Sequence, residues 1–95
     1  MENNLKIKKW NYGDYSSDNY GSHCQAINVG GKIFYFSYDT VIAFEGFANG
    51  KNYDCVCENI WGNTTGKHLN WIEKRKEKRL KRDEFLKLLD EFIKG

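Results

Sequence analysis

Residues 23–38 read HCQAINVGGKIFYFSY, and this stretch decides the fold. Two runs rich in apolar and aromatic residues flank the pair Gly30-Gly31, a pattern that predicts a β-hairpin with a two-residue turn. Such a turn fixes the register, so we expect three facing pairs: Val29 with Lys32, Ile27 with Phe34, and Gln25 with Phe36. We expect the side of the hairpin that carries Ile27, Phe34 and Phe36 to line the core.

The strand pattern continues on both sides of this hairpin. Residues 40–47 and 53–58 flank a second turn signal, Asn49-Gly50. Pairing across that turn predicts two further contacts: Phe44 with Cys55, and Ile42 with Cys57. With a short N-terminal strand, the sequence predicts an antiparallel meander of four to five strands over residues 5–58.

The pattern changes to helical spacing after residue 58. A short helix is expected at about 64–72, with Thr64 or Thr65 as its N-cap. A second helix is expected at 82–94, where an apolar stripe recurs at helical spacing in Phe85, Leu86, Leu88, Leu89, Phe92 and Ile93. The fold class is therefore α+β, with a single domain over residues 1–95. We expect the four- to five-stranded meander to be followed by a short helix and an amphipathic C-terminal helix packed on one face.

Composition limits the cellular setting. The chain has 95 residues and contains no apolar run long enough to span a membrane. Its first ten residues, MENNLKIKKW, lack the apolar stretch of a signal peptide, so we expect a cytoplasmic protein. The three cysteines would be reduced there.

One stretch comes close to a nucleotide-binding loop. Residues 62–68 read GNTTGKH, but only three residues separate the two glycines, and His68 stands where such loops place Ser or Thr. A nucleotide site is therefore not expected. Two interpretations remain open: an ordinary helix start, or a helix N-terminus that contacts an anion with help from Lys67.

The cysteines and histidines give only weak signals for a metal or a catalytic pair. Cys55 and Cys57 share one strand face, yet a lone C-x-C is a poor zinc signature even with His23, Cys24 and His68 in the chain. His23 and Cys24 are adjacent on a strand and point to opposite faces. We therefore expect no enzyme activity, no metal and no cofactor.

Charge is concentrated in a basic segment at residues 73–82, EKRKEKRLKR, which has seven basic and two acidic residues. The remainder of the chain has eight basic and eleven acidic residues. We expect this segment to connect the two helices, and three roles remain open: a solvated connector, a nucleic-acid contact, or docking onto an acidic protein. Its cations are Lys74, Arg75, Lys76, Lys78, Arg79, Lys81 and Arg82.

Three stretches, YSSDNYGSH, KIFYFSYDTVIAF and NIWGNTTGKHLNWI, followed by FLKLLDEFI, resemble a family of small domains of unknown function. Such domains are encoded by phages, plasmids and some archaeal genomes, and the TTGKHLN element is the most specific part of the resemblance. The family has no assigned activity, so no catalytic residue carries over. The resemblance implies a small mobile-element protein.

Small phage proteins without enzyme motifs often act by binding, and some resemble anti-CRISPR inhibitors that cover a working surface of a host nuclease. We therefore predict a non-catalytic binding protein that inhibits a host defence protein, located in the host cytoplasm if it is encoded by a phage. The alternative is a small nucleic-acid-binding module that uses residues 74–82. Besides the seven cations and Lys67, the candidate binding residues are the aromatic side chains of Tyr15, Tyr20, Trp61 and Trp71.

Overall fold

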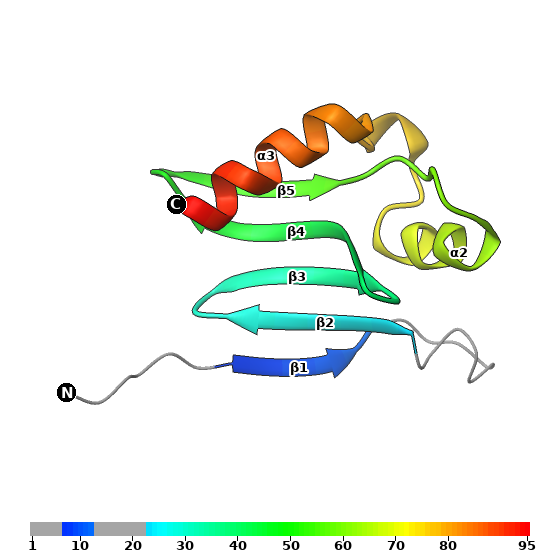
Figure 1. Ribbon diagram of the computed structural model, residues 1–95, viewed down its shortest axis with the longest axis horizontal. Helices are drawn as coiled ribbons and strands as arrows, with labels where there is room; N and C mark the ends of the chain where they lie inside the picture. The colour runs from blue at the N-terminus through cyan, green and yellow to red at the C-terminus, as the bar shows by residue number, and fades with distance from the viewer. Residues whose placement is uncertain (1–6, 13–22) are drawn as a thin grey trace.

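The computed structural model describes residues 7–12 and 23–95 of the chain. Five antiparallel strands form one sheet in the order β1-β2-β3-β4-β5, and two helices follow (Figure 1). This arrangement confirms the predicted α+β class and the meander. The elements are β1 (Ile7–Asn11), β2 (Cys24–Val29), β3 (Lys32–Ser37), β4 (Thr40–Ala48), β5 (Lys51–Val56), α2 (Asn63–Ile72), the short 3₁₀ helix η1 (Lys76–Lys78) and α3 (Arg82–Lys94).

Two-residue turns set the register of the sheet, as predicted. Gly30 and Gly31 have φ angles of 59° and 92°, and Asn49 and Gly50 have φ angles of 53° and 76°. Two consecutive positive φ angles are the requirement of a type I′ turn, which explains the Gly-Gly and Asn-Gly pairs. All the predicted pairs are confirmed: Val29 with Lys32, Ile27 with Phe34, Gln25 with Phe36, Phe44 with Cys55, and Ile42 next to Cys57 through a 2.9 Å backbone hydrogen bond.

A β-bulge in β4 redistributes its side chains between the two faces of the sheet. Tyr35 pairs with Ala43 and Phe36 pairs with Val41, so Ile42 is the extra residue. In such a bulge two successive side chains lie on the same side of the strand. Ile42 and Ala43 accordingly belong to one buried cluster, whereas Phe44 belongs to another.

The two helices pack on opposite faces of the sheet, which corrects the expectation of a shared face. Phe85 and Phe92 of α3 pack with Phe44 and Cys55, whereas Leu69 of α2 packs with Val56. Successive strand residues point to opposite faces, so Cys55 and Val56 mark the two sides. The predicted core face, which carries Ile27, Phe34 and Phe36, is one of two, because Cys24 and Ala26 on the other face are also buried.

The basic segment carries the chain from one face to the other around the edge of β5. Leu80 forms a parallel bridge with Cys57, with backbone hydrogen bonds of 2.7 Å to Val56 and 2.8 Å from Glu58. Leu80 also packs against the cluster that contains Phe85, as a hydrophobic staple before α3 does. Residues 73–82 therefore cover the end of β5, which is an edge strand, and lead the chain to α3 on the face opposite α2 (Figure 1).

Candidate binding surface

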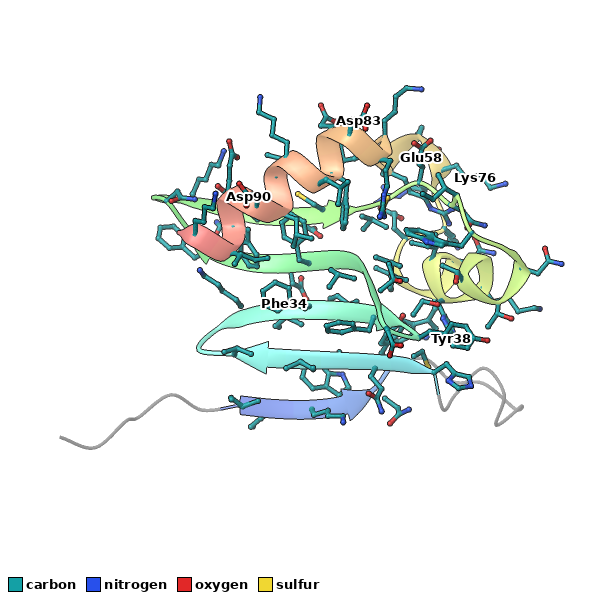
Figure 2. All side chains as sticks on the ribbon, viewed as in Figure 1. Phe34, Tyr38, Glu58, Lys76, Asp83 and Asp90 are labelled. Carbon is teal, nitrogen blue, oxygen red and sulfur yellow. The ribbon has the colours of Figure 1, made fainter. Side chains whose placement is uncertain are left out.

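A buried polar cluster joins α2 to the sheet. His68 and Ser37 are 0% and 2% exposed, and Ser37 Oγ lies 2.7 Å from His68 Nδ1. The same Oγ lies 2.8 Å from Thr65 Oγ1, and Thr65 is also buried. Hydrogen bonding lets these three polar groups be buried without a large penalty. Tyr38, in the turn after β3, lies beside α2 at this end of the sheet, with its ring 6.5 Å from that of His68 (Figure 2).

This cluster explains the TTGKH stretch, which sequence reasoning interpreted differently. The helix begins after Gly62, which caps it without a side-chain hydrogen bond, so neither Thr64 nor Thr65 is the N-cap. Thr65 and His68 instead lie three residues apart on the inner side of α2 and contact Ser37. A Ser–His pair resembles the core of a nucleophilic site, but this pair is enclosed and positions α2 on the sheet.

Two of the seven predicted basic contacts belong to the fold rather than to a free surface. Arg79 donates hydrogen bonds to the Glu73 carbonyl at 2.9 and 3.0 Å and to Asn70 Oδ1 at 2.8 Å. It therefore closes the C-terminal end of α2, where a cation is favourable. The Arg82 guanidinium stacks on Trp61 with its carbon 5.1 Å from the ring centroid.

The other cations of the segment differ in their surroundings. Arg75 forms a 2.7 Å ion pair with Glu73, and this hydrogen bonding lowers the pKa of Glu73. The four lysines of the segment are exposed: Lys74, Lys76, Lys78 and Lys81. Lys67, the predicted anion contact, is exposed on α2.

A first groove lies between α2 and the basic segment. Its volume is about 440 Å³, and its lining is polar: Glu58, Asn59, Gly66, Asn70, Lys76 and Arg79. Glu58 and Lys76 lie close together at this end of the molecule (Figure 2). Because Arg79 is already bonded to α2 and Glu58 adds a negative charge, the groove offers Lys76 as its main available cation.

A second groove, which we call the Trp71 groove, lies on the α2 face of the sheet. It measures about 330 Å³ and is lined by Tyr35, Ala43, Glu45, Asp54, Val56, Trp71, Ile72, Glu73 and Arg75, among others. Trp71 is 52% exposed and lies against Tyr12, with ring centroids 5.5 Å apart. Tyr12 is buried and donates a 2.8 Å hydrogen bond to the Phe36 carbonyl. One side of the groove is therefore formed by the partly exposed Trp71 ring, which packs against the buried and hydrogen-bonded Tyr12.

The polar end of the Trp71 groove is electronegative. The Tyr35 hydroxyl donates a 2.5 Å hydrogen bond to Glu45 Oε1. Burial, together with the Glu45 carboxylate and the nearby charge of Asp54, raises the pKa of Tyr35 well above its usual range. Tyr35 therefore stays protonated and serves as a donor at neutral pH.

The thiols are small buried groups. Cys24, Cys55 and Cys57 are buried and form no disulfide with one another, and burial raises the pKa of each. A buried, protonated thiol is a poor nucleophile and a poor metal ligand. Over residues 7–12 and 23–95, no group of three or more His, Cys, Asp or Glu side chains is placed to hold a metal ion. No helix in the described part of the chain is long and apolar enough to cross a membrane.

The structure thus separates the predicted binding residues that it describes into four groups, one of which is a set of exposed lysines outside both groove linings: Lys67, Lys74, Lys78 and Lys81. Trp71 and Arg75 line the Trp71 groove, and Lys76 lines the first groove, where Asn59 accepts a hydrogen bond from the backbone N–H of Trp61. Arg79 and Arg82 serve the fold. Tyr15 and Tyr20 lie outside the described residues. Sequence reasoning missed Tyr35, Glu45 and Asp54, although the alternation of β3, β4 and β5 places all three on one face.

Arg79→Met is expected to destabilise the domain by about 1–2 kcal/mol, because it leaves the end of α2 without its cation and its hydrogen bonds. Lys78→Met is the matched control, since Lys78 is a neighbouring exposed cation of the same segment. Urea unfolding followed by circular dichroism measures both. Equal midpoints for the two variants would contradict the role given to Arg79.

Comparison with models of protein families assigns most of the chain to a family. A family model described as "Family of unknown function (DUF8033)" matches residues 7–87, which is most of the chain. No curated protein and no solved structure matches the chain.

Proposed function

The chain belongs to DUF8033, a family of unknown function, and we propose that it is a non-catalytic domain that binds a partner protein. The observation that carries the proposal is the Trp71 groove. A half-exposed tryptophan held in place by a buried tyrosine is the kind of side chain that dominates protein interfaces, because little conformational entropy is lost when it is covered.

The surroundings of Trp71 support a protein partner. Further exposed apolar side chains on the same face include Trp10, which pairs with Ala26 in the sheet, and Phe47, which is 63% exposed. Exposed apolar groups interspersed with Glu45 and Asp54 match the mixed character of protein interfaces. These carboxylates would repel a nucleic-acid backbone at this face.

The specific form of the proposal follows the resemblance to phage and mobile-element proteins. We propose that the partner is a host defence protein, and that the domain inhibits it by covering a working surface, as anti-CRISPR proteins do. Binding of this kind needs no catalytic residue in the domain.

Affinity capture from a lysate of the source host tests the proposal. The immobilised domain is expected to retain a stoichiometric protein, and Trp71→Ala should reduce that retention by about 30-fold, the effect of losing one dominant interface residue. Leu86→Ala removes an apolar side chain that is 43% exposed on α3, and it should leave retention unchanged. Equal retention by both variants would overturn the proposal.

A second candidate, nucleic-acid binding, is favoured by the four exposed lysines of the basic segment. Lys74, Lys76, Lys78 and Lys81 contribute to no ion pair among the described residues. If they contact phosphates, reversing Lys76 and Lys78 to glutamate should abolish binding of a single-stranded oligonucleotide in a filter assay. Retention that is unchanged by this reversal, or insensitive to salt, would remove this candidate.

A further inference from the structure

The Trp71 groove continues into an open part of the sheet. Beyond the C-terminal end of α2, and over the residues that the structure describes, the α2 face carries Ile33, Glu45, Phe47 and Asp54. α2 covers the other end of this face, where Leu69 packs with Ile42 and Val56. A ligand that enters along the open part of the sheet therefore meets Trp71 and the end of α2.

The charges of the groove do not balance. Three carboxylates line it, those of Glu45, Asp54 and Glu73, against the single cation of Arg75. Arg75 is already committed to Glu73 through contacts of 2.7 and 3.1 Å. Glu45 and Asp54 therefore remain without a cation of their own in the lining, and Asp54 is exposed. A positively charged group bound in the groove would balance this excess of negative charge.

The apolar part of the groove defines the shape of that group. Ala43, Val56 and Ile72 provide aliphatic surface next to the Trp71 ring. This arrangement suits a side chain with an apolar stem and a cationic end. The volume of about 330 Å³ lies at the lower end of the range for ligand sites, roughly 300–1,000 Å³.

We propose that the Trp71 groove receives an arginine side chain that projects from the partner protein, with the guanidinium against Asp54 and Glu45 and the stem against Trp71. A planar guanidinium forms paired hydrogen bonds with a carboxylate, which a lysine ammonium cannot do, and the aliphatic stem of arginine packs well on an aromatic ring. The inference rests on the proposed protein-binding function, and it adds the chemistry that the partner presents.

Two tripeptide probes test this inference on the purified full chain. Acetyl-Gly-Arg-Gly-amide and the same peptide with neutral citrulline in place of arginine are titrated into labelled protein, and amide and indole resonances are followed by NMR. The arginine peptide is expected to shift the Trp71 indole and the amides of residues 45 and 54 in a saturable manner. The citrulline peptide should bind at least about tenfold more weakly, because its side chain carries no positive charge and cannot form an ion pair with the carboxylates.

Variants identify the groups involved. Asp54→Asn should weaken binding of the arginine peptide by about tenfold, since it removes the exposed carboxylate and keeps the shape of the side chain. Asp90→Asn, an exposed carboxylate on α3, is the matched control and should change nothing. Equal shifts with both peptides, no saturable shift, or displacement of the arginine peptide by a single-stranded oligonucleotide at residues 45, 54 and 71 would overturn the inference.

The inference and the proposed function can fail separately. A captured partner whose retention requires Trp71 but is unaffected by Asp54→Asn would uphold protein binding and contradict the arginine contact. A partner whose retention is unaffected by Trp71→Ala would contradict both.

Discussion

His68→Ala is expected to destabilise the domain by about 3 kcal/mol, because the variant leaves a cavity under α2 and removes a hydrogen-bond partner from Ser37. His68 is 0% exposed, and its Nδ1 lies 2.7 Å from Ser37 Oγ, so little water can replace the lost contact. A domain of this size has a total stability of roughly 5–14 kcal/mol. The midpoint of thermal unfolding should fall by about 12–24 °C.

The chain's other histidine supplies the control. His23 is half-buried and stacks on Tyr38 with ring centroids 4.2 Å apart, so His23→Ala should cost no more than about 1 kcal/mol. A double-mutant cycle with Ser37→Ala isolates the Ser37–His68 contact. Additive effects of the two substitutions, or equal effects of the two histidine variants, would show that the cluster does not hold α2 in place.

Phe44→Ala should have the largest effect of any single substitution considered, a loss of about 3–5 kcal/mol. Phe44 is 1% exposed and lies in the buried cluster between the sheet and α3. The centroid of its ring is 4.8 Å from that of Phe92 and 5.3 Å from that of Phe85. Removing its ring leaves α3 without the side chain around which the helix packs. Urea unfolding followed by circular dichroism gives the free energy.

Phe47→Ala on the same strand is the matched control. Phe47 is 63% exposed on the opposite face, so its loss should change the free energy of unfolding by less than about 0.5 kcal/mol. Similar losses for Phe44→Ala and Phe47→Ala would contradict the assignment of faces along β4.

Turn chemistry made most of the sheet predictable from the sequence. Gly30-Gly31 and Asn49-Gly50 each require two positive φ angles, and a two-residue turn leaves only one register for its strands. The α3 helix was also predictable, because Phe85 and Phe92 belong to a stripe of apolar residues at helical spacing. Both side chains are fully buried in the structure, as that stripe indicates. Local rules were sufficient for these elements.

The placement of the helices depended on two features that the residue pattern of a single element does not encode. The bulge at Ile42 gives the α2 face one more apolar residue than alternation predicts. Leu80 pairs with Cys57 at the edge of β5, and this bridge brings the chain around to the other face. The bulge arises between the two strands of the β3–β4 hairpin, whereas the Leu80 bridge joins segments that are far apart in the sequence.

The candidate site was predictable only in part. Trp71 is a candidate binding residue by its residue type, and the structure places it half-exposed at a groove, but its role in binding stays a prediction. The basic segment was treated as one unit, yet Arg79 and Arg82 are drawn into the fold by the α2 terminus and by Trp61. Tyr35, Glu45 and Asp54 come from three strands, and only the folded sheet brings them to one groove.

We propose that the domain recognises a partner protein through the Trp71 groove on the α2 face. Site-specific photocrosslinking tests it most directly, with a benzophenone side chain placed at position 71 or, as the control, at position 86 on α3. A covalent adduct with the captured partner is expected from position 71 and none from position 86. An adduct from position 86 alone, or equal adducts from both positions, would contradict the proposal.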